Sequence, residues 1–295
     1  MRRIAFEKYE GLGNDFVVID LPPAALTANE VIAMCDRHRG VGADGVLFVE
    51  RADERFAMRV LNADGSRAEM CGNGLRCVAL HLARTGRLEV GRSVDLETDA
   101  GPHPTTVLAL EDTRAQVRVA MRAASLEPAE VPVLREAPTI DASLQAGATS
   151  VRVTAVSMGN PHVVLFDVPD AARPGLGPLL ESHPLFPQKA NVGFARMLEG
   201  GAPATMELHV YERGAGWTRA CGTGACAAAV AAVETGRAVR GQPIEVRLPG
   251  GSLEITVGRR ADRISMAGPA RHVFTGSVAL PPRGPSRPPA PRDPA

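Results

Sequence analysis

Two cysteines that each precede a Gly-x-Gly turn are the residues with the clearest capacity for chemistry in this sequence. Cys71 is followed by Gly-Asn-Gly and Cys221 by Gly-Thr-Gly, and an apolar pattern with helical spacing follows each turn. A thiol at the start of a helix meets the positive end of the macrodipole, which favours thiolate and lowers the thiol pKa. The glycines let backbone N–H groups approach an anion such as a carboxylate. Two such thiols are suited to removing a proton from one face of a carbon and returning it to the other.

The surroundings of the two cysteines predict that one unit occurs twice. Both predicted helices end at a glycine followed by arginine, Gly86 and Gly236, at the same distance from their cysteine. The register continues into residues 94–101, which align with 244–251. Landmarks repeated in the same order indicate two copies of one α/β unit. If the copies pack about a pseudo-two-fold axis, the two thiols flank one cleft.

The elements between these landmarks predict strands joined by short turns, with one long helix in each half. This pattern indicates an α+β fold rather than a doubly wound sheet. Thr27 and Glu30 have the spacing of a capping box, so a short helix is expected to run from there to about Arg39. The segment Val273–Leu280 has no clear counterpart in the first half. The expected divisions are an N-terminal lobe over 1–121, a connection over 122–150, a C-terminal lobe over 151–270 and a disordered Pro-rich tail over 281–295.

Composition excludes several classes of protein. The chain of 295 residues is long enough for two cores, and its 33 basic and 33 acidic residues leave no broad positive surface for nucleic acid or acidic lipid. There is no apolar run that would serve as a signal peptide or membrane span, so a cytoplasmic protein is expected. Five cysteines without CxxC spacing argue against a disulfide framework or a zinc site. Three of them are interpreted as small buried hydrophobes: Cys35, Cys77 and Cys226.

The remaining polar residues predict catalysis by side chains alone. Only Lys8 and Lys189 are present, neither in a Schiff-base context, and no Rossmann or P-loop fingerprint occurs, so no cofactor and no metal are expected. A loop asparagine most often forms a turn. Near paired thiols, however, asparagines at strand ends are suited to binding ammonium and carboxylate groups, with Arg213 as a bidentate clamp. These asparagines are Asn14, Asn62, Asn160 and Asn191.

Five ordered motifs between about residues 4 and 280 resemble the diaminopimelate epimerase family. They are Gly11-Leu-Gly-Asn-Asp-Phe, Asn62-Ala-Asp-Gly-Ser with Cys71-Gly-Asn-Gly, Met158-Gly-Asn-Pro-His, Asn191-Val-Gly-Phe, and Glu212-Arg-Gly-Ala-Gly-x-Thr-x-Ala-Cys221-Gly-Thr-Gly. The resemblance implies two pseudo-symmetric lobes from an internal duplication, each a β-rich barrel around a central α-helix, with 271–280 returning to the first lobe. It also implies PLP-independent interconversion of LL- and meso-diaminopimelate, in lysine and peptidoglycan precursor biosynthesis, by a cytoplasmic homodimer.

The same resemblance implies roles for individual residues. Cys71 and Cys221 take the acid and base roles, and His162 and Glu212 assist the proton transfers. Gly45 stands where some members have Gln, and Trp217 stands where an acidic residue is common, which bears on fine specificity rather than on reaction type. The implied substrate contacts are Asn14, Asn62, Asn160, Asn191, Glu212 and Arg213, with Gly72, Asn73, Gly222 and Thr223 holding the reacting carboxylate.

Three alternative functions remain open. Proline, hydroxyproline or histidine racemases of the same fold use a similar cysteine pair, and Trp217 is compatible with such a shift, although the Gly-Asn-Asp-Phe and Glu-Arg-Gly motifs favour diaminopimelate. A thiol hydrolase built on Cys221 and His162 leaves the duplicated Cys71 without a role. A non-catalytic ligand-binding module is distinguished by alkylation with iodoacetamide that leaves all activity intact.

Overall fold

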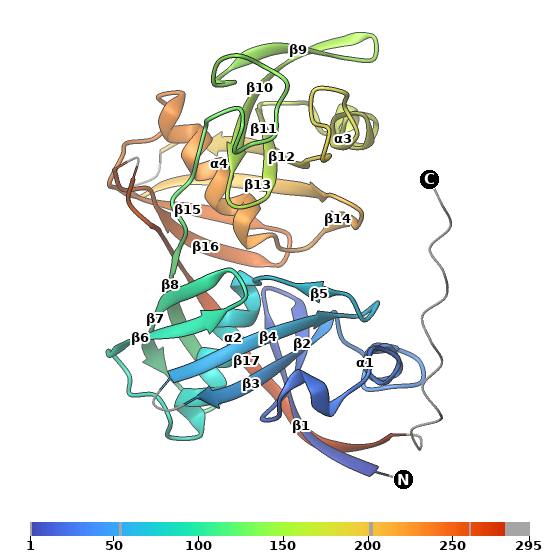
Figure 1. Ribbon diagram of the computed structural model, residues 1–295. Coiled ribbons are helices and arrows are strands. Elements are labelled where there is room, and N and C mark those ends of the chain that lie inside the picture. The colour runs from blue at the N-terminus through green and yellow to red at the C-terminus, as the bar shows by residue number, and fades with distance from the viewer. Residues whose placement is uncertain (1, 53–54, 201–202, 260, 281–295) are drawn as a thin grey trace.

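A computed structural model describes residues 2–52, 55–200, 203–259 and 261–280. Two lobes lie one above the other, and each encloses one long helix (Figure 1). The tail expected over 281–295 lies outside the described residues.

The first lobe is a closed ring of eight strands around helix α2 (Gly72–Arg84). Neighbouring strands pair in the order β1, β2, β3, β4, β6, β7, β8 and β17, and β17 pairs back onto β1. The pairs β2–β3 and β4–β6 are parallel, and the others are antiparallel. A short strand, β5 (Arg67–Ala68), extends from β4. The ring consists of β1 (Arg2–Gly11), β2 (Asn14–Ile19), β3 (Gly45–Ala52), β4 (Arg55–Asn62), β6 (Ser93–Thr98), β7 (Gly101–Leu110), β8 (Arg114–Met121) and β17 (Ile264–Leu280).

The second lobe repeats this connectivity around helix α4 (Gly222–Glu234). Its parallel pairs, β11–β12 and β13–β15, occupy the positions of the parallel pairs in the first lobe, which confirms the internal duplication. Strand β17 also pairs with β16, and a bridge between Ser125 and Ser157 brings the chain after β8 onto β10. The strands are β9 (Ala142–Ala146), β10 (Thr149–Ser157), β11 (Pro161–Phe166), β12 (Asn191–Leu198), β13 (Ala204–Glu212), β14 (Gly216–Thr218), β15 (Pro243–Leu248) and β16 (Gly251–Thr256).

Two elements depart from the expected outline. Strand β9 lies within the segment 122–150 that was expected to be a connection, and it pairs with β10. Strand β17 is a single element of 17 residues that joins the lobes. Its residues 264–271 pair with β8 and its residues 271–280 pair with β1, both in the first lobe, whereas residues 265–267 also pair with β16 of the second lobe. The last strand therefore belongs to both barrels (Figure 1).

Outer helices cover each barrel on one side. Helix α1 (Ala28–Cys35) packs over the first lobe, and α3 (Arg173–Glu181) takes the corresponding place in the second, each above a small apolar cluster separate from the main core. The capping box at Thr27 is present as expected, but α1 ends at Cys35 rather than near Arg39. It ends early because the Asp36 carboxylate accepts hydrogen bonds from the backbone N–H groups of His38 and Arg39 and turns the chain. Short 3-10 helices precede α1 and α3, at Pro23–Ala25 and Asp170–Ala172.

The two central helices end in the same way. Gly86 and Gly236 have φ angles of 71° and 72°, and the arginine after each glycine donates its backbone N–H to a carbonyl five residues earlier, at 2.8 and 2.7 Å. These are Schellman motifs, which confirm the predicted glycine stops. Both helices are enclosed on nearly all sides, so the single apolar face expected from the sequence is too narrow a description. Full enclosure fixes the start of each helix relative to its barrel.

Candidate active site

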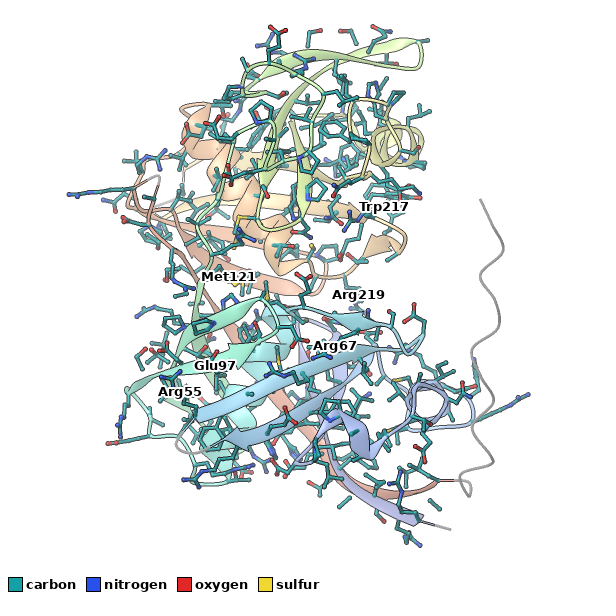
Figure 2. The ribbon with its side chains drawn as sticks, viewed as in Figure 1. Arg55, Arg67, Glu97, Met121, Trp217 and Arg219 are labelled. Carbon is teal, nitrogen blue, oxygen red and sulfur yellow. The ribbon has the colours of Figure 1, made fainter. Side chains whose placement is uncertain are left out.

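The N-terminal ends of the two central helices meet where the lobes join. Cys71 is the N-cap of α2 and Cys221 is the N-cap of α4, and each Sγ accepts a hydrogen bond from the backbone N–H three residues later at 3.3 Å. A Cβ added at Gly222 would lie 3.9 Å from Oδ1 of Asn73 and 3.3 Å from Sδ of Met266. Met266 also lies against Gly72. The first turns of both helices therefore border one site, near Met121 and Arg219 in Figure 2.

Burial determines the proton affinity of the two thiols. Cys71 is half-buried and Cys221 is buried. Burial raises the pKa of the Cys71 thiol. The hydrogen bond from the Gly74 N–H and the positive charge of Arg76 act in the opposite direction and lower it. Burial raises the pKa of Cys221 well above its usual value, and the negative charge of Glu212 raises it further. The expectation that the helix starts would lower both pKa values is therefore wrong, because desolvation outweighs the hydrogen bonds from the first-turn N–H groups. The other three cysteines are buried, as interpreted from the sequence.

Glu212 provides a proton acceptor beside Cys221. It ends β13, and its Oε1 accepts a hydrogen bond from Oγ1 of Thr218 at 2.5 Å across the hairpin to β14. Burial raises the pKa of Glu212, while hydrogen bonds from Thr218 and from the Cys221 thiol lower it. A carboxylate of raised pKa next to a thiol is suited to exchange a proton with it. Thr218 was not singled out from the sequence, although it lies within the last of the five motifs.

His162 is a buried, neutral imidazole. It lies on β11, and its Nε2 is 3.0 Å from Oδ1 of Asn160, so these two predicted site residues are in contact. Burial, together with the positive charge of Arg213, lowers the pKa of His162 to about 3. The ring therefore carries no charge near neutral pH and can act only through its neutral nitrogens.

Asn14 is the predicted substrate contact that lies beside Cys71. Its Oδ1 accepts a hydrogen bond from Nδ2 of Asn73 at 3.0 Å and lies 4.0 Å from Sγ of Cys71. Its Nδ2 donates to Asp44, a residue that sequence reasoning did not identify. By contrast, the amide of Asn62 donates to Ser66 in the loop after β4. The structure thus brings Asn14 and Asn73 together with the first thiol, whereas Asn62 is engaged within its own loop.

Asn191 holds the backbone of Arg213. Its Oδ1 accepts a hydrogen bond from the Arg213 N–H at 3.0 Å, and its Nδ2 donates to the Pro161 carbonyl at 3.1 Å. The Arg213 side chain is exposed and donates to the carbonyl of Gln188 at 2.8 Å. Asn191 is buried and both ends of its amide are occupied, so its observed role is to fix the loop that carries Arg213.

The two departures from the family pattern have structural explanations. A Cβ at Gly45 would lie 2.7 Å from the carbonyl oxygen of Leu61, so this backbone admits only glycine there. The Trp217 side chain is 44 % exposed and packs against Phe194 and Tyr211, with ring centroids 5.7 and 5.4 Å apart. The ring thus packs on one side chain of β12 and one of β13 in the second lobe, where Figure 2 labels it.

Other features of the molecule lie apart from this chemistry. Among the residues that the structure describes, no group of three or more His, Cys, Asp or Glu side chains is arranged to hold a metal ion. No helix in the described ranges has the length and apolar character needed to cross a membrane. A cavity of about 200 Å³ in the second lobe, bordered by Leu126, Arg240 and Ile264 among others, contains none of the predicted site residues.

Comparisons with known proteins give one consistent family. A family model described as diaminopimelate epimerase matches residues 6–127 and 154–273. A protein named diaminopimelate epimerase from Desulforudis audaxviator is 48% identical over 282 residues, covering 92% of this chain and 98% of the relative. One of the same name from Microcystis aeruginosa is 43% identical over 285 residues, covering 93% and 98%.

Solved structures of lower identity share the fold. A probable proline racemase from Agrobacterium radiobacter K84, solved with bound carbonate, superposes with a TM-score of 0.68 at 18% identity, covering 96% of this chain and 94% of that one. A PhzF-family phenazine biosynthesis protein from Bacillus anthracis has the same TM-score and identity, covering 95% and 100%. At this identity the likeness extends to the two-lobed architecture alone.

Proposed function

The chain belongs to the diaminopimelate epimerase family, and we propose that Cys71 and Cys221 are the two acid/base groups of its reaction. The protein is an isomerase that epimerises diaminopimelate in lysine biosynthesis. The observation that carries the two-thiol assignment is the meeting of the α2 and α4 starts, each with a cysteine at its N-cap. The mechanism that follows uses side chains and backbone groups only.

The reaction inverts one α-carbon by a proton transfer on each face. The thiolate of one cysteine removes the α-proton, and the thiol of the other gives its proton to the opposite face. Each cysteine is thus the base in one direction and the acid in the other. Negative charge develops toward the substrate carboxylate as the proton leaves. We expect the first-turn N–H groups of both helices to stabilise that charge. These groups belong to Gly72, Asn73, Gly222 and Thr223.

The remaining residues support proton transfer and substrate binding. Glu212 exchanges a proton with Cys221, and neutral His162 assists from its bond with Asn160. Arg213 binds the distal carboxylate as a planar fork, on a backbone held by Asn191. Three asparagines complete the set of substrate contacts: Asn14, Asn62 and Asn160.

The proposal extends to a cytoplasmic homodimer. The β1–β17 ribbon carries Val273 and Phe274, each 43 % exposed, on a strand that continues past β8. Exposed apolar side chains on such a ribbon are suited to contact a second copy. All five cysteines are free, which fits a reducing compartment.

Proton exchange in D₂O tests the proposed chemistry. With LL-diaminopimelate, the product is expected to carry deuterium at the inverted centre from the first turnover, while unreacted substrate stays largely protonated. A single base that both removes and returns the proton would instead retain some of the original proton. L-proline and L-histidine serve as comparison substrates, and faster α-proton exchange in either of them would favour another racemase activity.

Removal of each thiol tests the assignment directly. Cys71→Ala and Cys221→Ala are each expected to lower turnover in both directions by at least about 10²–10⁴-fold, because each face then lacks its acid or base. The matched control is Cys35→Ala, at a buried cysteine in the cluster under α1, which should retain turnover. Near-parental turnover in either active-site variant would show that the two Cys-Gly-x-Gly turns only bind anions.

A further inference from the structure

Arg76 is a fully buried cation beside the first turn of α2. Its side chain is 0% exposed, and its guanidinium donates to the Pro269 carbonyl at 3.0 Å, to Oδ1 of Asn73 at 2.8 Å and to the Gly72 carbonyl at 3.4 Å. Within the described part of the chain, no carboxylate lies at ion-pair distance from it. Arginine keeps its charge in proteins, and a buried charge without a counter-ion is costly. Such a group therefore calls for a role beyond packing.

The second copy of the duplicated unit has no such cation. Counting from the two catalytic cysteines, the position of Arg76 is occupied by Cys226 in α4. Conversely, Glu212 in the second copy corresponds to the neutral Asn62 in the first. The two thiols sit in equivalent helix caps, but one has a positive companion and the other a negative one.

Arg76 also fixes the direction of a chain of amides that reaches Cys71. A guanidinium can only donate hydrogen bonds, so Asn73 must turn its oxygen toward Arg76 and its nitrogen toward Asn14. Asn14 must then accept with its oxygen, which leaves its nitrogen to donate to the carboxylate of Asp44 at 2.7 Å. Because Arg76 at one end can only donate and the Asp44 carboxylate at the other can only accept, the two amides between them have a single possible orientation. As a result the oxygen of Asn14 faces Sγ of Cys71, where it can accept a hydrogen bond from the thiol but cannot donate one to a thiolate. A preference for thiolate at Cys71 must therefore come from the Arg76 charge and not from this amide.

We propose that Arg76 is a positioning residue that fixes the Asn73 and Asn14 amides beside Cys71, and that its buried charge, which has no counterpart beside Cys221, makes Cys71 the thiolate-bearing member of the cysteine pair before substrate binds. This inference rests on the proposed two-thiol function. Arg76 touches no reacting atom and acts through the first turn of α2 and through its charge.

The charged and titratable groups around this site agree with that asymmetry. Two charged groups act on the pKa of Cys71: Arg76 from its own helix lowers it, and Glu212 from β13 raises it. Arg76 is faced by Cys71 and Cys77 from α2, by Cys226 from α4 and by Glu10 from β1. Burial raises the pKa of both catalytic thiols, but the neighbouring cation opposes this rise only at Cys71, whereas Glu212 adds to it at Cys221.

The pH dependence of alkylation tests the proposal without turnover. Each thiol is alkylated with iodoacetamide at a series of pH values in the absence of substrate, and peptide mapping gives a separate rate for Cys71 and Cys221. The midpoints of the two profiles are compared rather than the plateau rates, because the thiols differ in burial. In the unsubstituted protein Cys71 should have the lower midpoint.

Substitutions of Arg76 should move one profile only. Arg76→Met is expected to raise the Cys71 midpoint by about one unit, which is about tenfold slower alkylation on the sloping part of the profile, and to leave the Cys221 midpoint unchanged. Arg76→Lys keeps the charge, so the Cys71 midpoint should stay close to its value in the unsubstituted protein. The matched control is Arg84→Met, at the far end of α2, where the side chain bonds to Glu7 and Tyr9. It should change neither midpoint.

Two results would overturn the inference. Equal shifts at both thiols, or none at either, would show that Arg76 only packs. If Arg76→Met fails to fold, a Cys221 midpoint below that of Cys71 in the unsubstituted protein rejects the proposal by itself. Failure of the two-thiol function is a different outcome, because it appears in the turnover of the cysteine variants and not in these profiles.

Discussion

Glu212 and His162 show how burial at single residues sets the protonation of the site. The carboxylate has a raised pKa next to a thiol, and the imidazole has a pKa of about 3 and stays neutral. Both shifts arise first from desolvation, which disfavours the charged form of each group. This difference is why we propose Glu212, rather than His162, as the group that exchanges a proton with Cys221.

This difference predicts the acid side of the pH–rate profile. As pH falls through the raised pKa of Glu212, its carboxylate becomes protonated and can no longer accept a proton from Cys221, so kcat/KM should fall. His162 titrates far below this range and should add no inflection near neutral pH. Glu212→Gln should lower kcat/KM by about 10²–10⁴-fold and remove the acid limb. The control is Glu254→Gln, at an exposed position on β16, which should leave the profile unchanged. If the acid limb persists in Glu212→Gln, a group other than Glu212 causes it.

Helix α3 illustrates how tertiary packing overrides propensity at the scale of one element. Its sequence, Arg-Pro-Gly-Leu-Gly-Pro-Leu-Leu-Glu, contains two glycines and an internal proline, so no helix was predicted there. The element forms because Leu176 and Leu180 are buried against the second lobe, in the place that α1 takes on the first. The first proline is tolerated because it lies in the opening turn.

The two glycines of α3 should respond oppositely to alanine. A Cβ at Gly175 meets no atom within 4 Å, so Gly175→Ala should stabilise the protein by about 0.4–1 kcal/mol by restricting the unfolded chain. A Cβ at Gly177 would lie 3.0 Å from Cγ of Tyr211, so Gly177→Ala should destabilise it by about 1–3 kcal/mol. Urea unfolding of the two variants measures the change in the free energy of unfolding, which should be positive for Gly175→Ala and negative for Gly177→Ala. A stabilised Gly177→Ala would mean that Tyr211 moves aside freely.

At the scale of the whole molecule, one glycine contact controls how closely the lobes approach. The Gly250 N–H donates to the Arg219 carbonyl at 2.8 Å, and a Cβ at Gly250 would lie 1.8 Å from the carbonyl oxygen of Leu12 in the first lobe. Leu12 lies in the turn between β1 and β2, two residues before Asn14. The lobe contact thus lies close in sequence to Asn14, which faces Cys71.

Gly250→Ala should therefore separate the lobes at this contact. A displacement of about 1 Å between the two thiols and their substrate can cost about 10²-fold in rate, so kcat should fall on this scale. Each thiol should remain open to alkylation, which separates this effect from loss of the cysteines. Gly175→Ala serves as the control for an added methyl group. Parental kcat in Gly250→Ala would show that catalysis does not depend on this approach of the lobes.

The sequence by itself determined the features that depend on neighbouring residues. The glycine stops at Gly86 and Gly236, the capping box at Thr27 and the repeated register of the two halves are local signals, and the structure confirms them. The ordered motifs were enough to identify the family. The roles assigned to the individual site residues stay predictions that the experiments above address.

Only the tertiary structure decided the features that depend on distant parts of the chain. Helix α3 exists because of a barrel wall that its own residues do not encode, and Arg76 acquires its meaning only when Pro269 and Asn73 surround it. The thiols of Cys71 and Cys221 show the same limit. The sequence alone could place both thiols at a helix start. The direction of their pKa shift, however, follows from burial by strands far away in sequence, and this burial outweighs the hydrogen bonds from the first-turn N–H groups.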